Sequence, residues 1–244
     1  MMTAITDLHS HVLPGIDDGS GSLEESLEML RLAGSQGITL MAATPHFDPR
    51  TDGPEAFLNR RDRAAQALLE KMEPGMPRLL LGAEVRYFRG ISESDALPLL
   101  TLEGGKALLL ELPPSPWPRE VWQELEQFHM RTGILPIVAH IDRYMGRFRF
   151  RDLPERLAEL DVLVQANSSF FLKKTTASLA LRLLREDKIH LLGSDCHGMR
   201  YRRPDLGAVR ETIQPCAEQI RRHEASILPG WALEHYLRER EKRL

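Results

Sequence analysis

Histidines and acidic residues follow most of the short apolar runs of this sequence, at the positions where buried strands are expected to end. Imidazole together with carboxylate is a ligand set for Zn²⁺, Mn²⁺ or Fe²⁺, and two cysteines are too few for a thiolate site. Nine such ligands exceed what one ion can use, which predicts a cluster of two or three divalent ions. The nine are His9, His11, Asp18, His46, Glu84, Glu111, His140, Asp195 and His197.

Taken singly, these residues have simpler explanations. A lone histidine at a strand end is more often a hydrogen-bonded structural residue, and we assign His129 and His190 to that class. Glu84 could merely pair with a nearby arginine, and Cys196 is expected to be a buried, reduced thiol rather than a nucleophile. Ser10 should point away from the histidines on either side of it, because side chains alternate along a strand. The whole set is different, because clustered acids are costly unless cations compensate them.

The apolar runs that carry these ligands predict a parallel sheet. Several runs are continuous rather than alternating, which is typical of strands covered on both faces. Seven strand-then-helix units favour a barrel or an open doubly wound sheet, and in both folds ligands gather at the carboxyl ends of the strands. The expected strands are Ala4–Leu8, Ile38–Ala43, Leu79–Leu81, Ala107–Leu112, Leu135–Ala139, Val162–Ala166 and Ile189–Leu192.

Amphipathic segments between these runs predict the helices. Ser22-Leu-Glu-Glu25 is a capping box, so we expect a helix to begin there. The charged segment Arg238–Arg243 is expected to belong to a solvated final helix. The other expected helices run from about Glu55 to Met72, Glu120 to Thr132, Thr175 to Arg185 and Asp205 to His223.

Composition limits the classes of protein to which the chain can belong. Its 244 residues show no repeat and no linker, so we expect one domain over residues 1–244. With 32 Lys and Arg against 35 Asp and Glu, the net charge of −3 gives no basic field for nucleic acid or an anionic membrane. Apolar runs are too short for a signal peptide or a membrane span, and two cysteines suit a reducing compartment. We therefore expect a cytoplasmic protein without membrane insertion.

The order of the motifs resembles the PHP (polymerase and histidinol phosphatase) superfamily. Within it, the pattern most resembles the manganese-dependent bacterial protein-tyrosine phosphatases of capsule and exopolysaccharide operons. The resemblance extends from about residue 4 to residue 206 and implies a distorted (β/α)₇ barrel that holds three metals. It rests on Asp7-Leu-His9-Ser-His11, Asp17-Asp18-Gly19, Thr44-Pro-His46, Gly82-Ala-Glu84, Glu111, His140-Ile-Asp-Arg143-Tyr144, Gln165-Ala-Asn167-Ser-Ser and Ser194-Asp195-Cys-His197.

The resemblance also implies a role for each site residue. Mn²⁺ is the implied cofactor, with Fe, Zn and Mg as alternatives, and Arg143 and Arg203 are implied to bind the substrate phosphate. Asp18 and His46 are counted with these arginines among the catalytic residues. For the metals, it implies His9, His11 and Asp195 at the first, Glu84 bridging to a second with Glu111 and His140, and Asp18, His46 and His197 at the third.

The expected reaction is hydrolysis of phosphotyrosine on a protein, implied to be the tail of a bacterial tyrosine kinase that regulates capsule or exopolysaccharide synthesis. One alternative is a histidinol-phosphate phosphatase or another small-molecule phosphoesterase of the superfamily. A second is a non-catalytic regulatory module, against which the intact ligand set argues. Phe47-Asp48-Pro49-Arg50 stands where the family often has basic residues, which bears on substrate preference. The sequence does not determine the oligomeric state.

Overall fold

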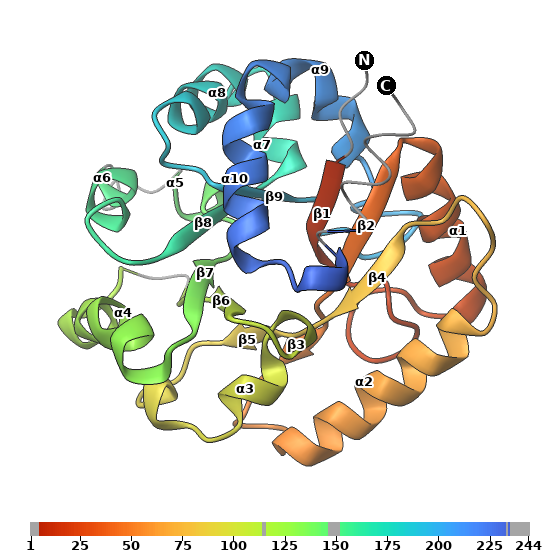
Figure 1. Cartoon of the computed structure of the whole chain (residues 1–244), viewed down its shortest axis with the longest axis horizontal. Coiled ribbons are helices and arrows are strands. Elements are labelled where there is room, and N and C mark those ends of the chain that lie inside the picture. Colours follow the sequence, from red (N-terminus) through yellow and green to blue (C-terminus); the bar gives the residue numbers. More distant parts are fainter. Residues whose placement is uncertain (1–4, 114–115, 146–151, 233, 235–244) are drawn as a thin grey trace.

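Parallel strands curl into a distorted barrel, with helices packed around it, in the computed structural model (Figure 1). The structure describes residues 5–113, 116–145, 152–232 and 234. Every strand pairing is parallel, as expected for successive strand-then-helix units. The described strands are β1 (Ile5–Ser10), β2 (Ile38–Ala43), β3 (His46–Phe47), β4 (Arg78–Leu81), β5 (Glu84–Arg86), β6 (Ala107–Glu111), β7 (Leu135–Val138), β8 (Leu163–Asn167) and β9 (Leu191–Gly193).

Two of the seven predicted strands are each followed, after a break of two residues, by a short strand that was not predicted, so nine are present in the described chain. Thr44-Pro45 separates β2 from β3, and Gly82-Ala83 separates β4 from β5. Proline has no N–H to donate to a ladder, which breaks the strand at that point. Backbone hydrogen bonds nevertheless connect the two breaks, from Gly82 N–H to Ala43 O and from Glu84 N–H to Pro45 O, each 3.0 Å long. The nine strands therefore occupy seven adjacent positions in the barrel, in sequence order.

The first and last strands close the barrel. The N–H of Asp195 donates to the carbonyl of His9 at 2.8 Å, and the N–H of His11 donates to the carbonyl of Cys196 at 2.9 Å. Of the two architectures that the sequence left open, the barrel is thus the one found. The predicted distorted (β/α)₇ barrel is confirmed.

Two apolar layers explain why the strands read as continuous hydrophobic runs. Leu8, Leu40 and Leu109 belong to a cluster inside the barrel, whereas Met41 and Leu108 belong to a larger one between the sheet and the helices. Neighbouring residues of one strand are therefore buried on opposite faces. The inner cluster is completed by residues at the carboxyl end of helix α10 (Ala217–Ile227), which crosses the front of the barrel in Figure 1.

The helices mostly agree with the prediction, with one correction. Ser22 caps α1, since its hydroxyl accepts the N–H of Glu25 at 3.2 Å. The helix expected from Asp205 to His223 is wrong, because the segment is divided into short turns and α10, and Pro215 lacks a donor within it. Residues 238–243 lie outside the described part. The remaining helices are α1 (Leu23–Ser35), α2 (Pro54–Leu69), α3 (Leu97–Leu100), α4 (Arg119–Thr132), α5 (Asp142–Met145), α6 (Leu153–Leu157), α7 (Ser168–Leu172), α8 (Ala177–Arg185) and α9 (Arg210–Ile213).

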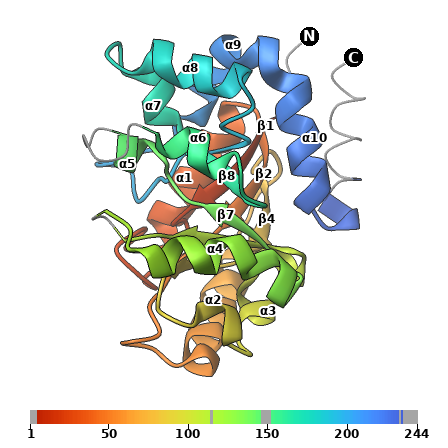
Figure 2. The same cartoon turned by 90° about the vertical axis from the view of Figure 1, so that its left-hand side faces the viewer.

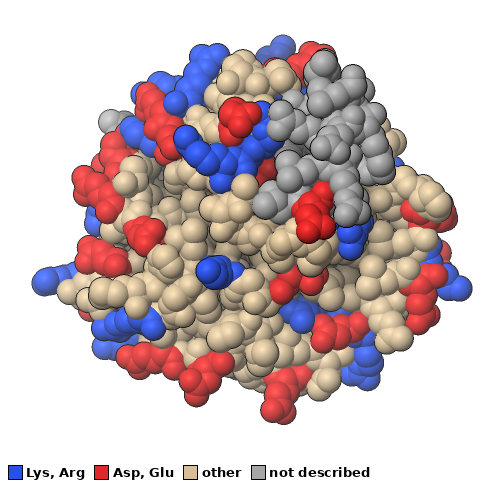
Figure 3. All heavy atoms as spheres, in the orientation of Figure 1, with Lys and Arg blue, Asp and Glu red and all other residues tan. Residues whose placement is uncertain are grey.

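The two ends of the barrel differ. In the side view of Figure 2, α10 lies at one end and α5, which follows β7, lies at the opposite end. The face that α10 covers carries acidic and basic side chains interspersed around its rim, without a field of one sign (Figure 3).

Within the described residues, every helix is too short or too polar to cross a bilayer.

Candidate metal centre

All nine predicted ligands meet at the carboxyl ends of the strands, opposite α10. Because parallel strands end at the same edge, residues far apart in the chain are brought together there. The strands or the loops directly after them position each side chain: His9 and His11 at β1, Asp18 in the loop that follows, His46 in β3, Glu84 in β5, Glu111 at the end of β6, His140 after β7, and Asp195 and His197 after β9.

One group of donor atoms surrounds Glu84. Its Oε2 lies 3.2 Å from Nε2 of His9 and 3.2 Å from Nε2 of His11, and these two nitrogens are themselves 3.2 Å apart. Oδ1 of Asp195 lies 3.6 Å from both nitrogens. Atoms bound about 2.1 Å from a shared ion lie about 3.0–3.4 Å apart in tetrahedral or octahedral geometry. This group therefore has nearly the spacing of one coordination sphere.

The other carboxylate oxygen of Glu84 faces a second group. Oε1 lies 2.8 Å from Nε2 of His140, and that nitrogen is 3.7 Å from Oε1 of Glu111. Glu84 is only 1% exposed and lies between the two groups. Its two oxygens thus have the arrangement of a bridging carboxylate.

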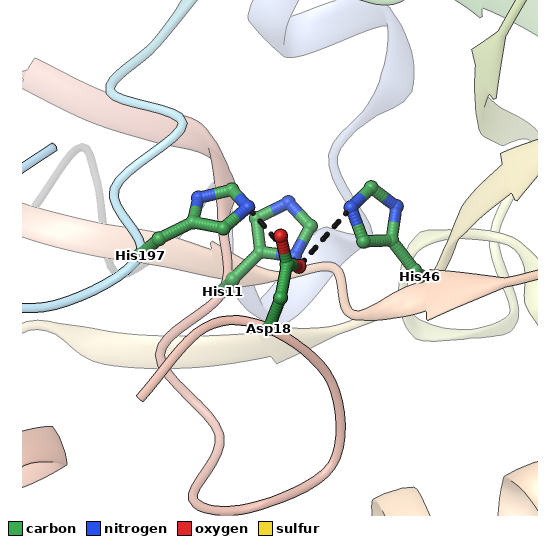
Figure 4. Close-up of side chains that lie close together, drawn as sticks. All are labelled: His11, Asp18, His46 and His197. Carbon is green, nitrogen blue, oxygen red and sulfur yellow. Dashed lines mark ion pairs between the residues drawn. The ribbon is translucent and has the colours of Figure 1, made fainter. Parts of the chain in front are cut away.

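A third group lies nearest to solvent (Figure 4). Oδ1 of Asp18 is 3.5 Å from Nε2 of His46 and 3.5 Å from Nε2 of His197, and the ring of His11 stands beside both histidines. The Asp18 side chain is 66% exposed, in contrast to the buried ligands around Glu84. Incoming molecules can therefore reach this third group from outside.

Several buried oxygen and nitrogen atoms of the proposed ligands lack a hydrogen-bond partner. Among the described residues, these include Oε2 of Glu84, Oδ1 of Asp195 and Nε2 of His197. Burial alone would raise the pKa of Glu84, but the neighbouring histidines, His9 foremost, hold that pKa well below its usual range. Buried anionic oxygens without a hydrogen-bond donor are costly unless cations compensate them. The set of nitrogen and oxygen donors fits divalent ions such as Mn²⁺, Fe²⁺ or Zn²⁺.

Two residues to which the sequence assigned no role hold the ligands in place. Oδ2 of Asp17 accepts the Nδ1 proton of His11 at 2.7 Å, which leaves Nε2 of that ring as a lone pair facing Glu84. Oε1 of Gln165 lies 3.2 Å from Nδ1 of His9 and accepts the N–H of His140 at 2.7 Å. Such outer hydrogen bonds fix the tautomer and orientation of metal-binding histidines.

Arginines line the mouth of the centre. The guanidinium of Arg143 pairs with Asp195 and lies 3.8 Å from Oε1 of Glu111. Arg203 is exposed, and it is the guanidinium of Arg202 that lies 3.2 Å from Asp195. Arg202 has a φ of 45°, and its carbonyl accepts the N–H of His197 at 2.9 Å, so the loop turns back toward the site at this residue.

Cys196, Ser10 and His129, to which the sequence assigned no part in binding metal, make only structural contacts. Cys196 is fully buried, and burial raises the pKa of its thiol. The hydroxyl of Ser10 donates to the carbonyl of Ala42 at 2.6 Å, away from the ligands. His129 pairs with Asp161 at the surface.

His190 lies near Asp187 and His223 in a separate group of potential ligands at the other end of β9. Its Nδ1 accepts the N–H of Val164 at 2.9 Å, so the proton of the neutral ring is on Nε2. Neither nitrogen of His190 is therefore left as a lone pair for an ion. A structural role explains this histidine.

Comparison with known proteins gives a consistent result. The model of the family described as "Capsular polysaccharide synthesis, CpsB/CapC" matches residues 5–226. Tyrosine-protein phosphatase YwqE of Bacillus subtilis is 30% identical over 202 residues, covering 80% of this chain and 78% of YwqE. Tyrosine-protein phosphatase CpsB of Streptococcus agalactiae is 28% identical over 220 residues, covering 85% of this chain and 88% of CpsB.

A solved structure is also similar. It comes from crystal structures of YwqE of Bacillus subtilis and CpsB of Streptococcus pneumoniae, described as unique metal-dependent tyrosine phosphatases. The TM-score is 0.69 at 27% identity, and the match covers 89% of this chain and 94% of the other.

Proposed function

Because this chain belongs to the capsular polysaccharide synthesis family CpsB/CapC, we infer that it is a metal-dependent tyrosine phosphatase. The observation that carries this inference is the convergence of nine histidine and carboxylate ligands at one end of the barrel, with arginines at its mouth. Ligands suited to divalent cations and arginines suited to an anion thus lie side by side. That combination suits hydrolysis of a phosphate monoester.

The first group of donors would hold one ion through His9, His11 and Asp195, and Glu84 would bridge to a second ion at Glu111 and His140. Asp18, His46 and His197 would hold a third. We propose Mn²⁺ as the ion at these sites. Such ions, when bound, lower the pKa of water and stabilise negative charge on phosphate oxygens. The protein contributes fixed ligand geometry, which Asp17 and Gln165 maintain from outside.

Arg143 and Arg202 are the phosphate-binding residues in this proposal. Both pair with Asp195 while their side chains stay partly exposed, so their remaining N–H groups are accessible to an anion. A guanidinium binds phosphate through two parallel hydrogen bonds, which gives orientation as well as charge. Arg203, implied by the sequence pattern, stays a prediction that substitution can decide.

Phosphotyrosine on a protein is the proposed substrate, with the tail of a tyrosine kinase in capsule or exopolysaccharide synthesis as the partner. Both relatives described above, YwqE and CpsB, carry the name tyrosine-protein phosphatase, which supports this choice. A phenolate with a pKa of about 10 also leaves more readily than an alkoxide, so it needs less help from an acid. Histidinol phosphate is the alternative substrate, and a non-catalytic regulatory role is the second alternative.

The test compares kcat/KM for a tyrosine-phosphorylated kinase tail, a phosphoserine peptide and histidinol phosphate at matched Mn²⁺ and pH. We expect the phosphotyrosine substrate to be hydrolysed fastest. A tenfold advantage for histidinol phosphate, about 1.4 kcal/mol in transition-state binding, would assign the enzyme to small-molecule hydrolysis. Failure to hydrolyse any of the three by a manganese-loaded protein would favour the regulatory role. Para-nitrophenyl phosphate is a poor substitute, because any aryl phosphate has a good leaving group.

A further inference from the structure

A pocket of about 530 Å³ opens beside the candidate metal centre. His140 and Arg143 line it on the side of the metal ligands, and Arg50 and Arg86 line it elsewhere. Tyr87 forms part of its wall. This pocket is therefore continuous with the site at which the phosphate is proposed to bind.

Charged side chains alternate in sign from this pocket across the mouth of the site. Nη1 of Arg86 lies 3.2 Å from Oδ2 of Asp48, and Nε of Arg86 lies 3.3 Å from Oε2 of Glu111. Arg143 lies on the other oxygen of Glu111, at 3.8 Å. The complete order is Arg50, Asp48, Arg86, Glu111, Arg143, Asp195, Arg202 and Asp18.

Asp48 differs from the other carboxylates of this row. Glu111, Asp195 and Asp18 are proposed metal ligands, whereas Asp48 is not. Its carboxylate is shared by two guanidinium groups, because Arg50 also binds it, with a closest approach of 2.5 Å. Both guanidinium groups lie within hydrogen-bond distance of this carboxylate. Two positive charges therefore face one dedicated negative charge.

Both arginines remain accessible to a ligand. The side chain of Arg50 is 66% exposed and that of Arg86 is 49% exposed. The part of the pocket wall that Tyr87 forms is held in place, since the hydroxyl of Tyr87 donates to Glu124 at 2.8 Å. Glu124 also accepts two backbone N–H groups of the following loop, from Gly90 and Ser92. A ligand thus meets exposed cations at the edge of a fixed pocket.

We propose that Arg50 and Arg86 form an anion subsite that binds an acidic group of the substrate near the phosphotyrosine, and that Asp48 weakens this subsite by competing for both arginines. The inference rests on the proposed phosphatase function. A single carboxylate, that of Glu111, separates Arg86 from Arg143. An extended peptide advances about 3.3 Å per residue, so the acidic group lies within a few residues of the phosphotyrosine. A glutamate or aspartate carboxylate and a second phosphoryl group share the required chemistry.

The experiment uses the manganese-loaded full chain and three phosphotyrosine peptides that differ only in the residues flanking the phosphotyrosine. One set of flanks is neutral, one contains glutamate and one contains phosphothreonine. Steady-state kinetics gives KM and kcat for each peptide. Variants Arg50→Gln and Asp48→Asn are compared with Arg60→Gln, which removes an exposed arginine of α2 that pairs with Asp52 outside the pocket. Thermal unfolding verifies that each variant is folded.

We expect the wild-type enzyme to favour at least one anionic peptide over the neutral one by about threefold in kcat/KM, mainly through KM, as for a half-exposed ion pair. Arg50→Gln should reduce this preference toward one, and Asp48→Asn should increase it. Arg60→Gln should leave the preference as it is. Raising the ionic strength should diminish the preference because the charges are accessible to salt. The two anionic peptides distinguish a carboxylate from a phosphoryl ligand.

Equal kcat/KM values for all three peptides in an active wild-type enzyme would overturn the subsite and leave the phosphatase function intact. So would a preference that both Arg50→Gln and Asp48→Asn leave unchanged. Lack of turnover on every peptide would instead overturn the phosphatase function, and the subsite with it.

Discussion

Oδ2 of Asp17 receives two hydrogen bonds from proposed metal ligands, one of 2.7 Å from Nδ1 of His11 and one of 2.9 Å from the N–H of His46. Although burial opposes ionisation, the bond from His11 lowers the pKa of Asp17 to about 2. A single anionic residue thus orients ligands that belong to two different groups of donors. Its effect on the centre should exceed that of an ordinary surface pair.

Replacing Asp17 by Asn should weaken Mn²⁺ binding by about 10- to 100-fold, because an amide lacks the charge and turns N–H groups toward the backbone donors. Calorimetric titration of the chelator-treated protein with Mn²⁺ gives the dissociation constants. The matched control is Asp161→Asn, which removes the carboxylate of an exposed Asp–His pair at His129. If both variants bind Mn²⁺ like the wild type, Asp17 has no role in orienting the ligands.

Substitution of Glu84 by Ala should cost more activity than substitution of Glu111 by Ala. The oxygens of Glu84 face two donor groups 3.2 Å and 2.8 Å away, whereas Glu111 faces only one of them. Elemental analysis should show two or three manganese ions in the wild type and a larger loss in Glu84→Ala. Equal losses of activity at saturating Mn²⁺ would remove the bridging assignment.

Arg143→Lys and Arg202→Lys should each lower kcat/KM for a phosphotyrosine peptide by about tenfold or more, since lysine keeps the charge but loses the planar fork. Arg203→Lys should have a smaller effect, because Arg203 is exposed whereas Arg202 pairs with Asp195. The three variants are measured under identical Mn²⁺ and pH. A larger loss in Arg203→Lys than in Arg202→Lys would reverse the assignment made from the loop geometry.

Glu224 should make the folded state less stable as the pH rises. This residue lies on α10, and burial raises the pKa of its carboxyl to about 8. The folded protein therefore keeps a proton that the unfolded chain releases near its ordinary pKa. This contribution to stability is complete below the ordinary pKa and is lost as the pH rises through about 8.

Urea unfolding of Glu224→Gln between about pH 5 and pH 8 should give a flatter profile of unfolding free energy than the wild type. Comparison with Glu211→Gln, which changes an exposed glutamate of α9, controls for net charge. Parallel profiles for wild type and Glu224→Gln would show that this carboxyl does not retain its proton on folding.

The sequence predicted the ligands that lie at or directly after the ends of buried strands. His9, Glu84 and Asp195 each follow an apolar run, and parallel strands place the ends of such runs together whatever the details of the loops. It could not predict the contact of Arg202 with Asp195, because several arginines share the loop and the left-handed φ of Arg202 depends on how the loop turns. Asp17 was visible in a motif, but its pairing with His11 depends on how a loop folds back.

The divided segment after Asp205 was missed for a different reason. Its apolar residues recur at helical spacing, so periodicity alone predicts one helix. Pro215 removes a donor there, and the chain must also turn to bring Ile227 and Leu228 into the inner cluster. Tertiary packing therefore overrides the local pattern.

Closure of the barrel by hydrogen bonds between His9 and Asp195 has a consequence for biosynthesis. During synthesis His9 and His11 leave the ribosome early, whereas Asp195 and His197 emerge only after most of the chain has been made. Until then the first strand lacks one of its two neighbours, and α10, which covers the barrel interior, emerges later still. Contacts of such long sequence separation form slowly. The nascent chain therefore exposes an unpaired strand edge and an incomplete set of ligands for most of its synthesis.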